Sequence, residues 1–139
     1  MQKIKLVIDT NIWVGYLLGK NVRTYLDKII GDTRFEIFIA STSILELQSV
    51  LNRSKFGKYI TPAQIENLLG LIERRSLQVN IISNIVMSRD AKDDFWLSLS
   101  IDAGADYLIT GDKDLLVLQI IETTSIITIA DFYALFYGS

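Results

Sequence analysis

Two short apolar runs, each followed closely by a carboxylate, constrain this chain more than any other feature. Ile4–Ile8 is followed at once by Asp9, and Tyr107–Ile109 is followed by a Thr-Gly-Asp turn that ends in Asp112. Short apolar runs rich in Ile and Val are typical of buried strands. If these strands are parallel neighbours, their acids meet at the carboxyl edge of the sheet, where open α/β proteins bind their ligands.

The rest of the chain alternates between helix-like and strand-like segments. Helices are predicted over residues 10–18, 22–30, 43–53, 61–75, 93–103, 115–118 and 131–136, and further strands at 35–40, 79–82 and 125–129. This alternation predicts an α/β fold, a three-layer α/β/α sandwich with a central parallel sheet of about five strands. At 139 residues the chain is expected to form a single domain over residues 1–139.

Two of these helices begin with a capping signature. Ser43 stands three residues before Glu46, and Thr61 stands three residues before Gln64 with Pro62 at the first helical position. In such a capping box the first side chain accepts from the backbone of the fourth residue, whose own side chain reaches back. Both helices are therefore predicted to start there, and a cap is one interpretation of Glu46.

Further acids lie between the two strand ends, at Glu46 and in the segment 90–94. Each acid has a structural interpretation, because Asp caps helices and is favoured in turns such as the one around Asp112. Their joint placement at strand ends and helix starts favours a functional interpretation. A pocket of four or more carboxylates is costly unless a divalent cation binds in it.

The composition narrows the chemistry of such a site. The chain has no histidine and no cysteine, which excludes disulfides, thiol chemistry, histidine general bases and the common zinc sites. Any metal site would therefore use oxygen ligands alone. No apolar run approaches the ~18 residues of a membrane span, and the N-terminus lacks the pattern of a signal peptide, so we expect a cytoplasmic protein.

The charge of the chain gives two indications about binding of a nucleic-acid substrate. The net charge of −2 argues against non-specific nucleic-acid binding by the whole surface. Basic side chains at the rim of an acidic site could still contact RNA. The alternative interpretation is that these side chains only form a solvent-exposed face. The candidates are Arg53, Lys55, Lys58, Arg89 and Lys113.

Four motifs along the chain resemble those of the PIN-domain family of nucleases. They span Val7–Asn11, Ser43–Phe56, Arg89–Leu97 and Ala105–Leu116, the last being the most specific. Within the family, the chain resembles VapC-like ribonucleases, the toxin components of toxin–antitoxin systems. It departs from their pattern at Ala91, where proline is common, and at Asp94, where asparagine is common.

The resemblance implies a fold, a site and an activity. The implied metal-binding and catalytic acids are Asp9, Glu46, Asp93 and Asp112, with Asn11, Thr110, Asp114 and Asp94 in auxiliary positions. Asp93 and Asp94 are adjacent, and the register to the following strand favours Asp93 as the ligand. The implied activity is a Mg²⁺- or Mn²⁺-dependent endoribonuclease acting on single-stranded RNA, with an antitoxin partner and a homodimeric assembly.

Two other functions remain open from the sequence. One is a structure-specific DNA nuclease, against which the small size argues. The other is a PIN-like binding module without catalysis, against which the intact acids argue. Three aromatic residues, Trp13, Tyr16 and Trp96, could stack on unpaired bases, although aromatic residues at helical spacing usually belong to a core.

Overall fold

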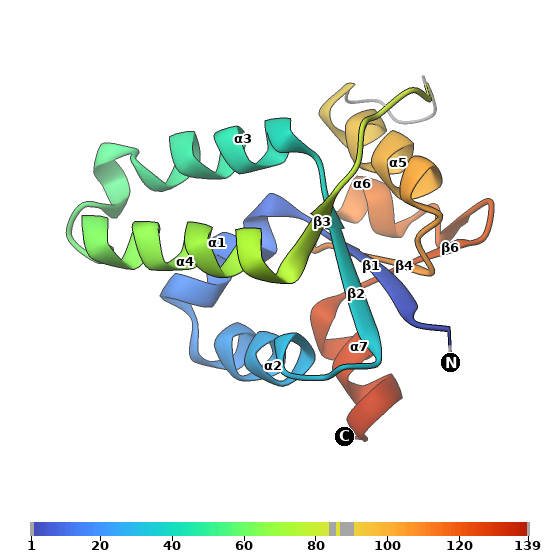
Figure 1. Ribbon diagram of the computed structural model, residues 1–139, viewed down its shortest axis with the longest axis horizontal. Coiled ribbons are helices and arrows are strands. Elements are labelled where there is room, and N and C mark those ends of the chain that lie inside the picture. The colour runs from blue at the N-terminus through green and yellow to red at the C-terminus, as the bar shows by residue number, and fades with distance from the viewer. Residues whose placement is uncertain (1, 84–85, 87–90, 139) are drawn as a thin grey trace.

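A computed structural model describes residues 2–83, 86 and 91–138, and it contains a six-stranded sheet flanked by helices (Figure 1). The strand order is β3-β2-β1-β4-β6-β5. Neighbouring strands run parallel except for β5, which is antiparallel to β6. The strands are β1 (Ile4–Ile8), β2 (Phe35–Ile39), β3 (Ser76–Gln78), β4 (Tyr107–Ile109), β5 (Ile120–Ile121) and β6 (Thr124–Ile127).

Helices cover both faces of this sheet, as predicted for a three-layer α/β/α sandwich. One face packs against α1, α2, α3, α4 and α7, and the other against α5 and α6. The helices are α1 (Thr10–Leu18), α2 (Lys20–Ile30), α3 (Ser41–Leu51), α4 (Pro62–Arg75), α5 (Ala91–Ala103), α6 (Lys113–Leu116) and α7 (Ile129–Tyr137), with a 3₁₀ turn, η1, at Ser54–Phe56.

Strand β1 shows why both faces must be covered. Successive side chains of a strand point to opposite faces, and here Leu6 and Ile8 lie in one core cluster while Val7 lies in the other. All three are almost fully buried. A continuous apolar run is therefore what a central parallel strand requires, and the prediction of a strand at this position is confirmed.

Most of the predicted helices and strands are present, with ends shifted by a few residues. The capping box at the start of α4 is confirmed, since Thr61 Oγ1 accepts from the Gln64 N–H (3.2 Å) and Gln64 Oε1 accepts from the Thr61 N–H (2.8 Å). Helix α2 ends at Gly31, as its apolar spacing suggested.

The prediction of a capping box at Ser43 is wrong. Strand β2 leads almost directly into α3, which begins at Ser41 with Ala40 at the cap position and no side-chain cap. The helix therefore starts two residues before the predicted point. The buried hydroxyl of Ser43 has no hydrogen-bond partner among the described residues. Glu46 lies on the exposed side of α3, so capping does not explain this acid.

The predicted position of the third strand also needs correction. The third strand is Ser76–Gln78 and not 79–82, because α4 leads directly into it and its register with β2 pairs Ile37 with Ser76. The short antiparallel strand β5 was not predicted, so the described sheet has six strands where about five were expected. Strand β5 has only two residues, which is too short for a recognisable sequence pattern.

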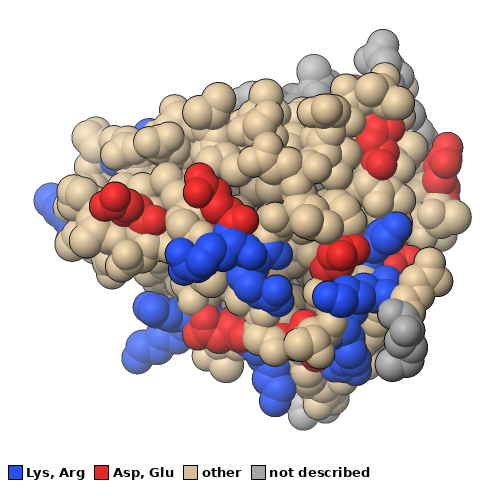
Figure 2. Space-filling view, viewed as in Figure 1, with Lys and Arg blue, Asp and Glu red and all other residues tan. Residues whose placement is uncertain are grey.

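The charged side chains do not form a uniform basic surface on the face shown in Figure 2. Basic and acidic side chains are intermixed there, with the basic ones gathered mainly in the lower half of the view, and few charges lie over α3. Among the described residues, no helix is long and apolar enough to cross a membrane.

Candidate metal centre

The two strands that were predicted to bring their acids together are β1 and β4. These strands are parallel neighbours in which Ile8 pairs with Ile109, and the backbone N–H of Asp9 donates to the Ile109 carbonyl (2.9 Å). Asp9 and the turn that contains Asp112 therefore leave the sheet side by side. This register is the structural reason why residues about a hundred positions apart share one site.

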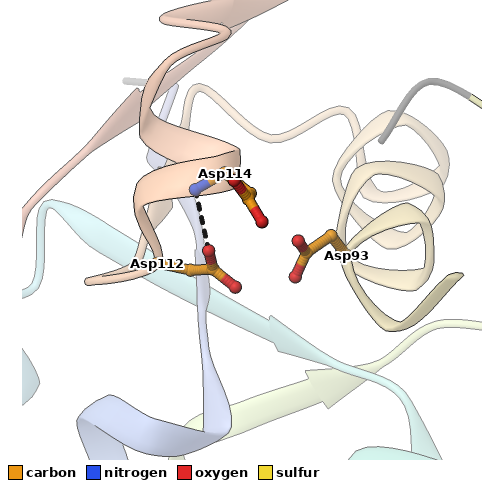
Figure 3. Close-up of side chains that lie close together, drawn as sticks. All are labelled: Asp93, Asp112 and Asp114. Carbon is orange, nitrogen blue, oxygen red and sulfur yellow. Dashed lines mark hydrogen bonds between the residues drawn. The ribbon is translucent and has the colours of Figure 1, made fainter. Parts of the chain in front are cut away.

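Three carboxylates converge next to this edge. Asp93, Asp112 and Asp114 each offer an oxygen atom, and these atoms lie within 4.8 Å of one another. In Figure 3 the three side chains point toward a common space, Asp93 from the first turn of α5 and the other two from the start of α6. Asp93 is buried, whereas Asp112 and Asp114 are partly exposed.

Local backbone geometry fixes the two acids of α6. Asp112 is the N-cap residue of this helix, and its Oδ1 accepts from the backbone N–H of Asp114 (2.8 Å). The Asp112 N–H in turn donates to Thr110 Oγ1 (3.1 Å). One oxygen of Asp112 is thus used for capping, and the other can face the group. The structural and functional interpretations of this residue are compatible.

Asp9 lies beside the three-carboxylate group. It is only 5% exposed, and it caps α1 by accepting from the Asn11 N–H (3.2 Å). Its second oxygen accepts from the Thr110 hydroxyl (2.8 Å), so Thr110 joins Asp9 to the backbone of Asp112. Burial raises the pKa of Asp9, and the nearby negative charge of Asp112 raises it further, against the lowering effect of these hydrogen bonds.

Glu46 lies on the rim of a neighbouring pocket. This pocket, with a volume of about 390 Å³, is lined by Thr42, Glu46, Arg53, Phe95 and Trp96. It adjoins the acids because Trp96 follows Asp93 by three residues on α5, a spacing that places both side chains on the same side of the helix. Glu46 is exposed and is not part of the three-carboxylate group. Its role as a metal ligand stays a prediction.

The auxiliary acids and amides occupy different positions. Asp94 is partly buried and is not in the three-carboxylate group, in which its neighbour Asp93 takes part. Asn11 is exposed and contributes its backbone N–H to Asp9. Thr110 is fully buried between Asp9 and Asp112. The sequence placed Asp114 among the auxiliary groups, although the structure brings it as close to the other acids as Asp93 and Asp112 are.

The basic and aromatic candidates are more scattered. Arg53 lines the pocket with Glu46, whereas Lys55, Lys58 and Lys113 are exposed. Arg89 lies outside the described residues. Trp13 is 2% exposed and belongs to the core, so it is not available to stack on a base. Thr42 and Phe95 were missed because nothing in a single sequence indicates that α3 and α5 enclose a pocket.

The donor set fits a hard divalent cation. Carboxylate oxygens are the ligands that Mg²⁺ and Mn²⁺ prefer, and Mg²⁺ is usually held by one or two carboxylates together with water and substrate phosphate. One buried and two partly exposed carboxylates from two helix starts can provide such ligands. Burial is the main cause of the raised pKa of Asp9, and the negative charge of Asp112 adds to it.

Comparisons with known proteins agree with this geometry. A family model described as "PIN domain" matches residues 5–114. An uncharacterized protein of Methanocaldococcus jannaschii, MJ1680, is 27% identical over 119 residues, which cover 84% of this chain and 76% of that protein.

Solved structures share the fold at low sequence identity. PAE2754 from Pyrobaculum aerophilum superimposes with a TM-score of 0.67 at 12% identity, over 98% of this chain and 91% of that one. VapBC2 from Rickettsia felis, solved bound to a DNA fragment from its promoter, gives a TM-score of 0.59 at 16% identity, over 88% of this chain and 97% of the matched chain. At these identities the likeness concerns the fold alone.

Proposed function

The chain belongs to the PIN-domain family, whose members are generally nucleases, and we propose that it is a Mg²⁺- or Mn²⁺-dependent endoribonuclease. The proposed reaction is hydrolysis of phosphodiester bonds in single-stranded RNA. The observation that carries the proposal is the convergence of Asp93, Asp112 and Asp114 within 4.8 Å at the carboxyl edge of the sheet. Cellular RNA is found in the cytoplasm, so we place the proposed activity there.

We assign the cation to Asp93, Asp112 and Asp114, with Asp9 and Glu46 as the adjoining acids. When bound, a divalent ion supplies charge neutralisation at the phosphate and activation of water for in-line attack. This chemistry needs no histidine, in keeping with a chain that has none. Asp93 is 4% exposed, so a cation there would interact with a carboxylate shielded from water, where electrostatic attraction is strong.

The surrounding residues orient these acids and help to accept a polyanion. Thr110 holds the Asp9 carboxylate by its hydroxyl and holds the Asp112 backbone through the same oxygen. At the start of α6 the Asp114 backbone N–H donates to the Asp112 carboxylate, which favours the negative charge of that group. Lys113 is exposed next to Asp112 and is placed to attract phosphate at the rim.

A single-stranded substrate is favoured by the charge of the chain. Proteins that follow a duplex by its phosphates commonly present a continuous basic surface. Here the net charge is −2 and the charges on one face are mixed (Figure 2). A flexible single strand can instead bring one phosphate to the acids while its bases contact nearby pockets.

The test is cleavage of a labelled single-stranded RNA by the purified protein. We expect cleavage with Mg²⁺ or Mn²⁺, none with EDTA, and none by the Asp112→Asn variant. A matched flap-DNA substrate run in parallel would reveal a DNA nuclease by preferential cleavage. Equal cleavage with EDTA and by the variant would mean a contaminant and would contradict the proposal.

We also propose that the chain is a toxin with a cognate antitoxin and that it forms a homodimer. The likeness in fold to the matched chain of VapBC2 supports a toxin–antitoxin partner. The product of the gene directly upstream is the first candidate, and co-expression followed by affinity purification would test it. Light scattering on the purified chain would test the dimer, since a monomeric mass would contradict it.

A further inference from the structure

We propose that the pocket between α3 and α5 binds an unpaired nucleobase of the substrate strand, next to the phosphate held at the acids. The pocket has a volume of about 390 Å³, and its lining residues are Thr42, Glu46, Arg53, Phe95 and Trp96. The proposal rests on the proposed nuclease function and specifies how that site would recognise its substrate.

The pocket wall on the α5 side is aromatic. The rings of Phe95 and Trp96 lie edge to face, with centroids 5.1 Å apart and an interplanar angle of 87°. Trp96 is 6% exposed and is anchored in the core, whereas Phe95 is only partly buried and belongs to the rim of that core. A rigid indole therefore supports a more accessible phenyl ring, which is an arrangement suited to stacking a flat ligand.

The opposite wall is polar and is provided by α3 and the turn that follows it. Thr42 and Glu46 are exposed residues on α3, and Arg53 follows the helix directly. Together they offer a hydroxyl, a carboxylate and a guanidinium, which can bond the donors and acceptors on the edge of a base. Because aromatic and hydrogen-bonding groups face the same space, the pocket suits a nucleobase better than an aliphatic chain.

The position of the pocket links it to the acids. Asp93 and Trp96 are three residues apart on α5, and side chains at that spacing lie on the same side of a helix, so the metal-binding group adjoins the aromatic wall. Glu46 borders the pocket as well. A base seated against Phe95 would direct its sugar–phosphate backbone toward the acids.

Binding can be measured without any metal. The probe is a short RNA analogue with uncharged methylphosphonate linkages, which the acids do not repel, compared with the same analogue lacking one base. The chain has two tryptophans, and Trp96 lines the pocket while Trp13 is buried elsewhere in the core. We expect the complete analogue to quench tryptophan fluorescence, and the quenching to vanish in Trp96→Phe.

Variants of Phe95 separate stacking from folding. Phe95→Leu keeps an apolar side chain and should bind the complete analogue about tenfold more weakly, because the stacked ring is lost. Phe95→Tyr keeps the ring and should bind as the unchanged protein does. Tyr59→Leu is the matched control, since Tyr59 is an exposed aromatic residue outside the pocket, and it should have no effect.

Equal binding of the complete and base-lacking analogues, or unchanged binding by Phe95→Leu, would overturn the inference. Normal binding by Phe95→Tyr would exclude a folding defect as the cause of weak binding in Phe95→Leu. A protein that cleaves RNA but shows no base-dependent binding would contradict only this inference. A protein that binds the base but cleaves no RNA with any divalent metal would contradict only the proposed function.

Discussion

Asp9 and Asp32 are aspartates at opposite edges of the same sheet, and their surroundings shift their pKa values in opposite directions. Asp9 follows β1 at the carboxyl edge, where burial raises its pKa. Asp32 precedes β2 at the amino edge, where hydrogen bonds from Arg34 lower its pKa. The same residue type is thus buried and hydrogen-bonded to neutral groups at one edge, and paired with an arginine at the other.

At the amino edge, Asp32 forms contacts that stabilise the fold. Asp32 accepts from Arg34 Nη2 (2.7 Å) and from the Tyr137 hydroxyl (2.6 Å), which joins the C-terminal helix α7 to the start of β2. The Arg34 guanidinium also lies over the rings of Phe35, Phe136 and Tyr137. Burial, and then the hydrogen bond to Asp32, raises the pKa of Tyr137 to about 12.

The carboxyl edge shows the opposite arrangement. The partners that orient Asp9 are a neutral hydroxyl and a backbone N–H, and the closest charge acting on it is the negative charge of Asp112. Selection for stability alone would remove such a group. The proposed metal site accounts for this difference, because a bound cation would stabilise the buried carboxylate, and the following predictions test the comparison between the two edges.

The largest expected effect is on catalysis. Asp112→Asn should keep the cap of α6, because the amide oxygen can still accept from Asp114, but should lower RNA cleavage at least about a hundredfold. The metal-free variant should melt at a higher temperature, since one of several crowded negative charges is gone. Asp32→Asn is the matched control at the amino edge, and it should cleave RNA normally.

A second effect, about tenfold, concerns the residue that orients the acids. Thr110→Val keeps the shape of the side chain and removes the hydroxyl that donates to Asp9 and accepts from Asp112. We expect the affinity for Mn²⁺, measured by calorimetry, to fall about tenfold. Thr124→Val is the control, because Thr124 is equally buried but its hydroxyl bonds the Ala105 carbonyl. A similar loss in both variants would mean a general folding defect.

At the amino edge the expected effect is on stability and not on activity. Asp32→Ala removes the acceptor of Arg34 and Tyr137 and should lower the free energy of unfolding by about 1 kcal/mol, because the pair is partly exposed. Urea denaturation would measure this change. Cleavage of RNA per folded molecule should stay the same, and a loss of cleavage would show that the two edges are coupled.

The smallest effects are in the pH dependence of stability, where the two aspartates should have opposite signs. Both start from the ordinary pKa of 3.8 in the unfolded chain. The lowered pKa of Asp32 stabilises the fold above that value, and this stabilisation is lost as the pH falls through the folded pKa. The raised pKa of Asp9 destabilises the metal-free fold increasingly as the pH rises from 3.8 through its folded pKa.

Variants would separate these two contributions. The stability gained by Asp9→Asn in EDTA should grow with rising pH, whereas the stability lost by Asp32→Asn should shrink as the solution is acidified. Unfolding curves between about pH 3 and pH 7 would show both trends. Parallel curves for the two variants would contradict the contrast between the edges.

The sequence was sufficient to predict the parts of the site that follow from local patterns. Apolar runs that end in Asp9 and Asp112 predicted parallel strands whose acids meet, and the structure confirms the sheet that brings them together. The positions of Asp114 and Phe95 depend on how α6 and α5 turn onto the sheet, which no local pattern reports. The link between Asp32 and Tyr137 joins residues 105 positions apart and was equally invisible.

Errors arose where tertiary context overrides a local signal. Ser43 and Glu46 match a capping box in sequence, but α3 begins at Ser41 because the end of β2 delivers the chain directly into the helix. The motif that suggested a structural role for Glu46 therefore does not act as a cap. Its place beside the pocket with Arg53 and Phe95 became visible only in three dimensions.

The most direct test of the central claim is the anomalous scattering of crystals soaked in Mn²⁺. We expect one strong peak or a pair of peaks among the carboxylates of Asp93, Asp112 and Asp114, and no peak in crystals of Asp112→Asn. We expect no peak at Asp32, where the carboxylate is already paired. The absence of a peak at the three acids, or an equal peak in the variant, would contradict a metal centre at the carboxyl edge.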